Sequence, residues 1–520
     1  MAQAILGSAK LSRRDPRTHV MGCTSSTPAP AGLPLAPREQ KAPARDFEKA
    51  EDTPASAYST RASETDEQSK EPLLLVFSET GNGSTPAVEE KPAETIELTE
   101  LAKDKDVEKA VEEPLADART AVVSTPTPQS PVKEYFGKFA GAGVAAMPRP
   151  PLTQTAFSWF GSFTGMAILG LLHGYFVSPQ SPVHLVLLIP SFGAMAVLVF
   201  SACKAPLAQP RNVLLGNTIG GTCGWLVFKV MSFAGLESFM WLSAALAVSL
   251  TIVIQEHAKA VHPPGGATAL AFIIVAPLHA LDFVYIFCPA LLGAIILVVV
   301  GLFTNNLSAA RTYPQGWGFG TVSAYKENPE DSAVKAFFGK FAGAGVDGPP
   351  APAMSYSGFS FMGSFLGIAI LGLCDTYLSP AMPQLHLKFL IASFGAMAVL
   401  VYSQPKAPLA QPRNVLLGNT IGGIVGVCVV KLLEIMGLGG MLWLNGALAV
   451  SLTIVLQELT FSVHPPGGAT ALIYVVLPLI RPLGFEYILS PAFLGAAMLL
   501  VIGLLTNNLS AARAYPQGWF

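Results

Sequence analysis

The chain contains one apolar unit twice, and this duplication limits the folds open to it more than any other feature. The string HPPGGAT stands at His262–Thr268 and again at His464–Thr470, and KAPLAQPRNVLLGNTIGG at 204–221 recurs at 406–423. Shorter strings, TNNLSAAR and FGKFAGAGV, recur in the same register. Repetition at this period indicates a duplicated domain rather than a solenoid of short repeats. Both copies should therefore adopt one fold.

The composition is that of a membrane protein. Hydrophobic residues make up 51% of the chain and charged residues 13%, whereas a soluble domain carries about 25% charged residues. The formal net charge of −2 gives no argument for a nucleic-acid partner. We therefore expect an integral protein whose first partner is the lipid bilayer, with no nucleic acid bound.

Residues 1–130 differ from the rest of the chain. They are rich in Ala, Pro, Ser, Thr and Glu, which predicts disorder because such a segment buries too little apolar surface to fold. Residues 1–45 are basic and poor in acids, as in an organelle transit peptide, although a merely basic tail fits equally. A third reading takes Met21 as the start, which would make Gly22 a myristoylation site beside Cys23.

Six apolar stretches follow in each copy, most of them near the ~20 residues that a helix needs to cross a bilayer. We predict an all-α polytopic membrane protein with two parallel tandem repeats of about six transmembrane helices each, preceded by the disordered region. The first transmembrane domain should cover 135–317, a linker 318–336, and the second domain 337–520. The stretches are 157–176, 184–202, 212–234, 239–255, 266–280 and 283–303, then 359–378, 386–404, 414–436, 441–457, 468–482 and 485–505.

The positions of the cations support an even number of crossings. Lys204, Lys259 and Arg311 fall on one side if the first copy crosses six times, and the opposite connections are poor in Lys and Arg. This is the positive-inside bias. Lys406 and Arg513 repeat it, so both copies should have the same orientation, related by an axis along the membrane normal. Four crossings per copy remain open if the fifth stretch is re-entrant. The positive side would be cytosolic, stromal or matrix.

The HPPGGAT string predicts a broken helix. Two prolines prevent a helix from running through it, two glycines permit unusual backbone angles, and the apolar residues that follow should begin a half-helix. Free N–H groups at such a terminus bind anions, and discontinuous helices mark substrate sites in transporters. The alternative is a tight interfacial turn capped by His262. The candidate substrate-binding residues are His262, Gly265, Gly266 and Thr268, with His464, Gly467, Gly468 and Thr470 in the second copy. The histidines could also couple transport to protons.

The longest repeated string adds further candidates. Arg211 and Asn217, with Arg413 and Asn419 in the second copy, could guide and contact an anion. Helix packing by small residues together with positive-side anchoring explains the same string. Glu256 ends an apolar stretch, where we expect it to be exposed at the interface, with proton carriage as the alternative. Arg311 should anchor and cap a helix end, or else lie on the pathway.

Nothing in the sequence predicts an enzyme. It has no GxSxG, HExxH, Walker or kinase pattern, and its six cysteines form no CxxC pair. We therefore predict no catalytic residue, no cofactor and no metal.

The His-Pro-Pro string, SFGAMAVLVF at 191–200 and AQPRNVLLGNTIGG at 208–221 resemble the HPP family of integral membrane proteins. The resemblance covers residues 136–317 and again 338–519, whereas family members are usually described with a single domain. Plant and cyanobacterial relatives are associated with nitrite transport, in plants across the chloroplast envelope. The resemblance therefore implies a carrier of nitrite or another small anion, in the plastid envelope, another organelle or the plasma membrane.

Two other functions remain open from the sequence. One is an anion channel. The other is a non-transporting scaffold or sensor that binds a protein partner through its N-terminal tail. Assembly into a homo-oligomer is open as well.

Overall fold

A computed structural model of the chain describes residues 130–144, 148–178, 180–181, 185–318, 331–345 and 349–519. The predicted disordered region up to residue 129 lies outside these residues, as do the transit and myristoylation signals and most of the predicted linker, at 319–330.

Every regular element in the described part of the chain is a helix. Each of the six apolar stretches of the first copy contains a helix, although residues 185–189 of the second stretch are not helical. The helices are α4 (Leu152–Val177), α5 (Ser191–Ala196, continued to Ser201), α6 (Pro210–Phe233), α7 (Met240–His257), α8 (Pro263–Ile274) and α9 (Leu292–Asn305, preceded by Ile286–Leu291).

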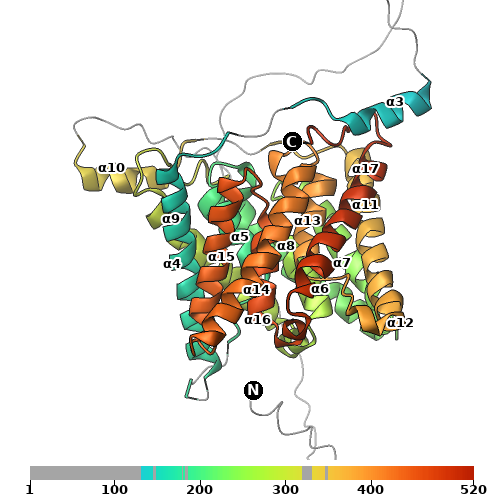
Figure 1. Cartoon of the computed structure of the whole chain (residues 1–520). Helices are drawn as coiled ribbons and strands as arrows, with labels where there is room; N and C mark the ends of the chain where they lie inside the picture. The colour runs from blue at the N-terminus through green and yellow to red at the C-terminus, as the bar shows by residue number, and fades with distance from the viewer. Residues whose placement is uncertain are drawn as a thin grey trace, which may run out of the picture. The chain divides into compact units, whose positions relative to one another are not determined.

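The second copy repeats this order. Its helices are α11 (Met354–Leu373, continued to Ala381 through α12, Ser379–Ala381), α13 (Ser393–Ala398, continued to Ser403), α14 (Asn419–Ile435, extended back to Asn414), α15 (Leu442–Leu459), α16 (Pro465–Val476) and α17 (Leu494–Asn507, preceded by Ile488–Phe493). A short helix precedes each copy, α3 (Pro131–Gly137) and α10 (Ala333–Gly339). The long helices stand side by side, and α3 and α10 lie at one end of them (Figure 1).

Only four helices per copy are long enough to cross a membrane, which makes eight within the described residues. The other two segments cross as half-helices joined to non-α backbone. Leu187 donates its N–H to His173 Nδ1 near the end of α4, whereas Cys203, beyond α5, lines a cavity with Gln154 at the start of α4. The segment that contains α5 therefore returns along the whole length of α4.

The segment of α8 also runs from one end to the other. His262, just before α8, contacts Leu207, which precedes α6, whereas Asp282, after α8, pairs with Lys229 near the end of α6. Each copy thus runs between the two ends six times, four times as a long helix. The predicted two-repeat fold with about six helical crossings per copy is confirmed in this form.

The two copies are intertwined rather than merely adjacent. Helix α4 packs on α15 and α11 on α7, while α5 packs on α16 and α8 on α13. Small residues permit this close approach at the centre. An added Cβ at Gly266 would lie 2.4 Å from the carbonyl oxygen of Gly395. Four alanines meet at the same crossing, namely Ala194, Ala267, Ala396 and Ala469.

The predicted parallel orientation is also confirmed. Lys204 and its equivalent Lys406 line the same cavity, so the equivalent ends of the two copies lie at the same end of the protein. The outward faces of the long helices carry exposed apolar side chains, among them Leu171, Leu226 and Leu432. Such faces suit contact with lipid tails, as expected of an integral multi-pass membrane protein.

Candidate functional site

Two cavities open between the copies, at the end where the His-Pro-Pro corners lie. Their volumes are about 730 and 540 Å³, and they share the lining residues Gln154, Ser201, Ala202, Lys204, Pro408 and Leu409. Because the shared residues come from both copies, the two cavities form one hollow at the repeat interface. We call this hollow the vestibule.

The walls of the vestibule are basic. Two acids line it, against the six cations Arg149, Lys204, Lys259, Arg311, Lys406 and Arg413. Among the described residues no acid forms an ion pair with Lys204, Lys259 or Lys406. A partly enclosed cavity lined by one sign of charge concentrates counter-ions. The vestibule therefore favours an anion.

At the opposite end of the protein, acids offset the cations. Lys229 pairs with Asp282 at 2.9 Å, Lys388 with Asp375 at 2.5 Å and Arg481 with Glu434 at 3.5 Å. The Lys229 ammonium and the Trp225 indole N–H, which both bond to Asp282, lower the pKa of that exposed carboxyl. At the vestibule, by contrast, cations exceed acids by six to two.

The two vestibule acids, Glu256 and Glu458, are buried, with exposed fractions of 1% and 2%. Ser360 donates its hydroxyl to Glu256 Oε1 at 2.7 Å, and the same hydroxyl accepts from Arg513 Nη2 at 2.6 Å. The expectation that Glu256 is exposed at the interface is therefore wrong. A position near the end of a helix did not reveal that a helix of the other copy covers it.

Glu458 has matching contacts with the first copy. Ser158 donates to Glu458 Oε1 at 2.7 Å and accepts from Arg311 Nη2 at 2.6 Å. Arg311 also donates through Nη1 to the carbonyl oxygen of Phe200 at 2.7 Å. It thus satisfies a helix end, as predicted, but from a buried position rather than as an interfacial anchor. Each Arg–Ser–Glu chain ties one copy to the other.

The His-Pro-Pro corner begins a half-helix, as the sequence predicts, but it does not present free amides. Pro263 and Pro264 have no N–H, and the Gly265 N–H donates to the His262 carbonyl oxygen at 2.9 Å. Gly265 packs against the backbone of Gly216. In the second corner, the Gly467 N–H donates to the His464 carbonyl oxygen. Gly467 packs against the backbone of Gly418, and Gly468 packs against that of Gly193. The prediction of exposed donors at Gly265, Gly266, Gly467 and Gly468 is therefore corrected, because backbone of neighbouring helices covers these glycines.

His262 stabilises the corner. It is fully buried, and Nδ1 lies 2.8 Å from the carbonyl oxygen of Leu207. Gln255 bonds both to its backbone N–H and to its carbonyl oxygen. Burial lowers the pKa of His262 to about 4, with the bond to Leu207 acting weakly in the other direction. His464 repeats this against Leu409, with a pKa also lowered to about 4 by burial. Both imidazoles are neutral near pH 7, which argues against the suggestion that they carry protons.

Arg211 and Arg413 lie near the vestibule, but each bonds to a helix end. Arg211 donates to the carbonyl oxygens of Lys259 and Ala258, both at 2.8 Å, just beyond α7. Arg413 donates to Thr460 O at 2.9 Å, beyond α15. Arg413 lines the vestibule, whereas Arg211 lines a smaller cavity of about 430 Å³ beside it. Their charge can attract an anion, although part of each guanidinium is committed to the fold.

Asn217 and Thr268 come together, deep between the helices. Thr268 Oγ1 lies 2.6 Å from Asn217 Oδ1 and 2.8 Å from Ser191 Oγ, and Asn217 Nδ2 donates to Ala290 O at 2.6 Å. All three side chains are fully buried. Asn419, Thr470 and Ser393 repeat the cluster in the second copy. These groups bond to one another and do not line the vestibule, so this geometry ties α5, α6 and α8 together.

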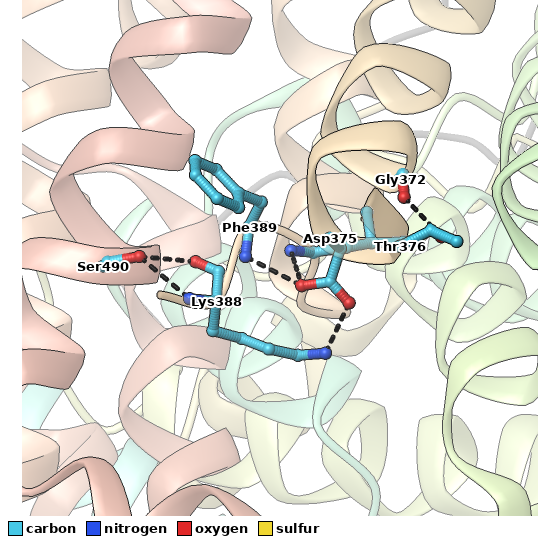
Figure 2. Close-up of polar contacts among 7 residues, drawn as sticks. Gly372, Asp375, Thr376, Lys388, Phe389 and Ser490 are labelled. Atoms are coloured by element: carbon cyan, nitrogen blue, oxygen red, sulfur yellow. Dashed lines mark hydrogen bonds and ion pairs between the residues drawn. The ribbon is translucent and has the colours of Figure 1, made fainter. Parts of the chain in front are cut away.

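The two copies differ at one structural contact, which Asp375 makes in the second copy (Figure 2) and His173 makes in the first. Asp375 accepts the backbone N–H groups of Phe389 and Leu390, at 2.8 and 3.2 Å, and pairs with Lys388. In the first copy, His173 accepts the equivalent N–H of Leu187. Each copy thus fixes the extended chain before its half-helix with a different acceptor. The exchange of His173 for Asp375 preserves a structural contact.

Comparisons with known proteins agree with the duplication. The protein-family model for the HPP transmembrane region matches residues 147–314 and again residues 349–516. A transmembrane protein of Dictyostelium discoideum is 39% identical over 184 residues, which are 35% of this chain and 57% of that protein. A second transmembrane protein of the same organism is 35% identical over 185 residues, 35% of this chain and 63% of that protein. The chain thus spans about three-fifths of the length of these relatives. No solved structure matches the chain.

Proposed function

Since the chain belongs to the HPP family of transmembrane proteins, whose model matches more than half of its length, we propose that it transports a small inorganic anion, with nitrite as its substrate. The observation that carries the proposal is the basic vestibule between the two copies. Its six cations surround a space large enough for a hydrated monovalent anion. Nitrite itself is suggested by the family resemblance.

The helices beneath the vestibule suit a transport path. Leu207 and Leu409, which contact the two corner histidines, form part of its lining. The half-helices α5, α8, α13 and α16 meet further in, at the glycine and alanine crossing. Discontinuous helices at the interface of two repeats are where transporters commonly hold their substrates, and rocking of one repeat against the other gives alternating access.

The location is proposed on separate grounds. The basic, acid-poor leader and the resemblance to plant nitrite carriers both support the plastid envelope. A fluorescent protein fused to the C-terminus would test this by its coincidence with an envelope marker in plant cells.

Anion flux into proteoliposomes tests the proposed function. The full chain should move nitrite faster than protein-free vesicles do, within a panel that includes nitrate, formate and bicarbonate. Lys204→Gln combined with Lys406→Gln removes the two vestibule lysines that occupy equivalent positions in the two copies and form no ion pair among the described residues. The initial rate should fall roughly tenfold, because the local anion concentration falls with the potential.

A matched control changes the same charge elsewhere. Lys229→Gln with Lys431→Gln removes the equivalent pair of lysines from the long helices α6 and α14 outside the vestibule, and should leave the rate within about twofold of the parent. Absence of flux for every anion would reject a transporter and favour a scaffold. Equal losses in both double variants would show that the vestibule has no special part.

A further inference from the structure

Among the acids that the structure describes, Glu256 and Glu458 stand apart because each is buried and yet lines the vestibule. One oxygen of each carboxyl has a donor, from Ser360 or Ser158. The other oxygen, Oε2, is buried and has no hydrogen-bond partner within the part of the chain that the structure describes. The same arrangement occurs twice, in copies that differ at other polar positions such as His173 and Asp375.

A carboxylate in such a place is costly. Burial removes water from the charge, and a buried oxygen without a donor gains nothing in return. Arg513 and Arg311 reach these carboxyls only through the hydroxyls of Ser360 and Ser158. No direct ion pair to Glu256 or Glu458 forms among the described residues. Binding of a proton at Oε2 removes the buried charge.

Several other titratable or charged groups lie around the two acids. Burial raises the pKa of the Cys203 thiol, which stays neutral, and burial lowers the pKa of His262 and His464 to about 4. The titratable or charged groups around Glu256 are Tyr356, Arg513, His257, Lys259, Lys204, Arg311 and His262. Those around Glu458 are Arg311, Cys203, Arg149, Lys204, Lys406, Arg413 and His464.

An anion in the vestibule and a charge on either glutamate oppose each other. Two like charges in a partly buried site repel across several ångströms. Thermodynamic linkage then requires that an anion bind more tightly to the protonated form, and that a bound anion strengthen proton binding by the same factor. The cations alone would give an anion site with no such dependence on protons.

We propose that Glu256 and Glu458 are proton-binding sites coupled to the anion, so that protons and anions are taken up and released together. This rests on the proposed function and adds the coupling ion to it. A proton from the aqueous phase binds at Oε2 when the anion enters the vestibule, and leaves to water when the anion leaves. Each proton carried in this way cancels the charge of one monovalent anion.

The test is a binding measurement on the purified full chain, because nitrous acid crosses bare lipid and would confuse a flux assay at low pH. Nitrite affinity is measured between pH 7.5 and 5.5, and proton uptake on binding is followed with a pH indicator in weak buffer. The parent should bind nitrite roughly tenfold more tightly at the lower pH. It should also take up protons as nitrite binds.

Glu256→Gln with Glu458→Gln should remove both effects and hold the affinity near the low-pH value of the parent. Glu237→Gln with Glu434→Gln removes two acids outside the vestibule and should leave both effects intact. If the double vestibule variant does not fold, each single variant serves, and should retain about half of the proton uptake.

The outcomes separate the two proposals. Binding by the parent without pH dependence or proton uptake would overturn the coupling alone. A full response in the Glu256 and Glu458 variants would overturn the assignment to these residues. Failure of the folded parent to bind nitrite or any other anion of the panel would overturn the proposed function, and the coupling with it.

Discussion

At the residue scale, the glycines of the two corners act through the space they leave free. An added Cβ at Gly266 would lie 2.4 Å from the Gly395 carbonyl oxygen, and one at Gly395 would lie 2.1 Å from that of Gly266. The partner in both contacts is backbone, which cannot rotate away as a flexible side chain can. Alanine at either position therefore has to push two helices apart.

Gly266→Ala and Gly395→Ala should each destabilise the protein, by about 1–3 kcal/mol or more. Thermal unfolding in detergent, followed by intrinsic fluorescence, would measure the loss as a lower Tm. Gly358→Ala in α11 is the control, because nothing lies within 4 Å of its added Cβ. Alanine there should leave the Tm unchanged or slightly raised, since alanine favours a helix over glycine. If Gly266→Ala left the Tm as high as Gly358→Ala does, α8 and α13 would not be in tight contact at Gly266 and Gly395.

These glycines also show where sequence reasoning stops. The prolines and glycines correctly predicted that a helix begins at the corner, because that depends on local backbone chemistry. They did not show what approaches the glycines, since Gly395 lies in the other copy. The expected exposure of Glu256 is wrong for the same reason. Its burial depends on Ser360 and Arg513, which are far from it in sequence.

At the element scale, periodicity and length found all six helical stretches of each copy. The long helices could be predicted because apolar length is a property of one segment. The two half-helices were harder, since α5 follows an extended stretch and α8 continues into a tighter helix at Ala276–Leu281. Hydropathy depends on how apolar the residues are and not on their backbone conformation. It therefore predicts that a segment crosses the membrane, but not whether it crosses as a long helix or as a half-helix.

The short helices α3 and α10 have the form of interfacial anchors. Each exposes a valine and a phenylalanine four residues apart, Val132 and Phe136 in α3 and Val334 and Phe338 in α10. The Tyr135 hydroxyl of α3 donates to Leu505 O in the last helix, α17. Such a helix is expected to lie flat at the membrane surface with its apolar face in the acyl boundary.

A tryptophan placed on that face reports its surroundings. Fluorescence of Phe136→Trp should be quenched more by brominated lipids than that of the parent, because the new indole contacts brominated acyl chains. Glu134→Trp puts the same indole on the polar face of α3 and should add fluorescence with little extra quenching. Equal quenching of the two variants would show that α3 does not lie flat with one face in lipid.

At the scale of the whole molecule, the duplication predicts two equivalent units in parallel, and the structure confirms them. What it did not predict is which copy supplies each contact. Helix α4 meets α15, and its equivalent α11 meets α7, the equivalent of α15. The sequence is silent on this point because exchanging partners between near-identical copies leaves the local pattern unchanged. The fold is thus a dimer of domains joined into one chain.

One copy alone should therefore pair with itself. Residues 130–332 contain both α4 and α7, whose equivalents form the main contact between copies, so the fragment can rebuild that contact as a homodimer. Light scattering on the detergent-solubilised fragment should give the mass of two chains. Gly170 lies at this contact, where an added Cβ would meet Trp443 Cα at 2.5 Å, and Trp241 is the equivalent residue within the fragment.

Gly170→Val in the fragment should then shift the population to monomer or unfolded chain, because the valine holds α4 away from its partner. Gly174→Val, one turn further along the same helix, has nothing within 4 Å of its added Cβ and should leave the dimer intact. A fragment that is folded and monomeric before any substitution would contradict the exchange of helices between copies. A dimer insensitive to Gly170→Val would show that the copies pair through another face. The contact between α4 and α15 would then not be what forms the vestibule.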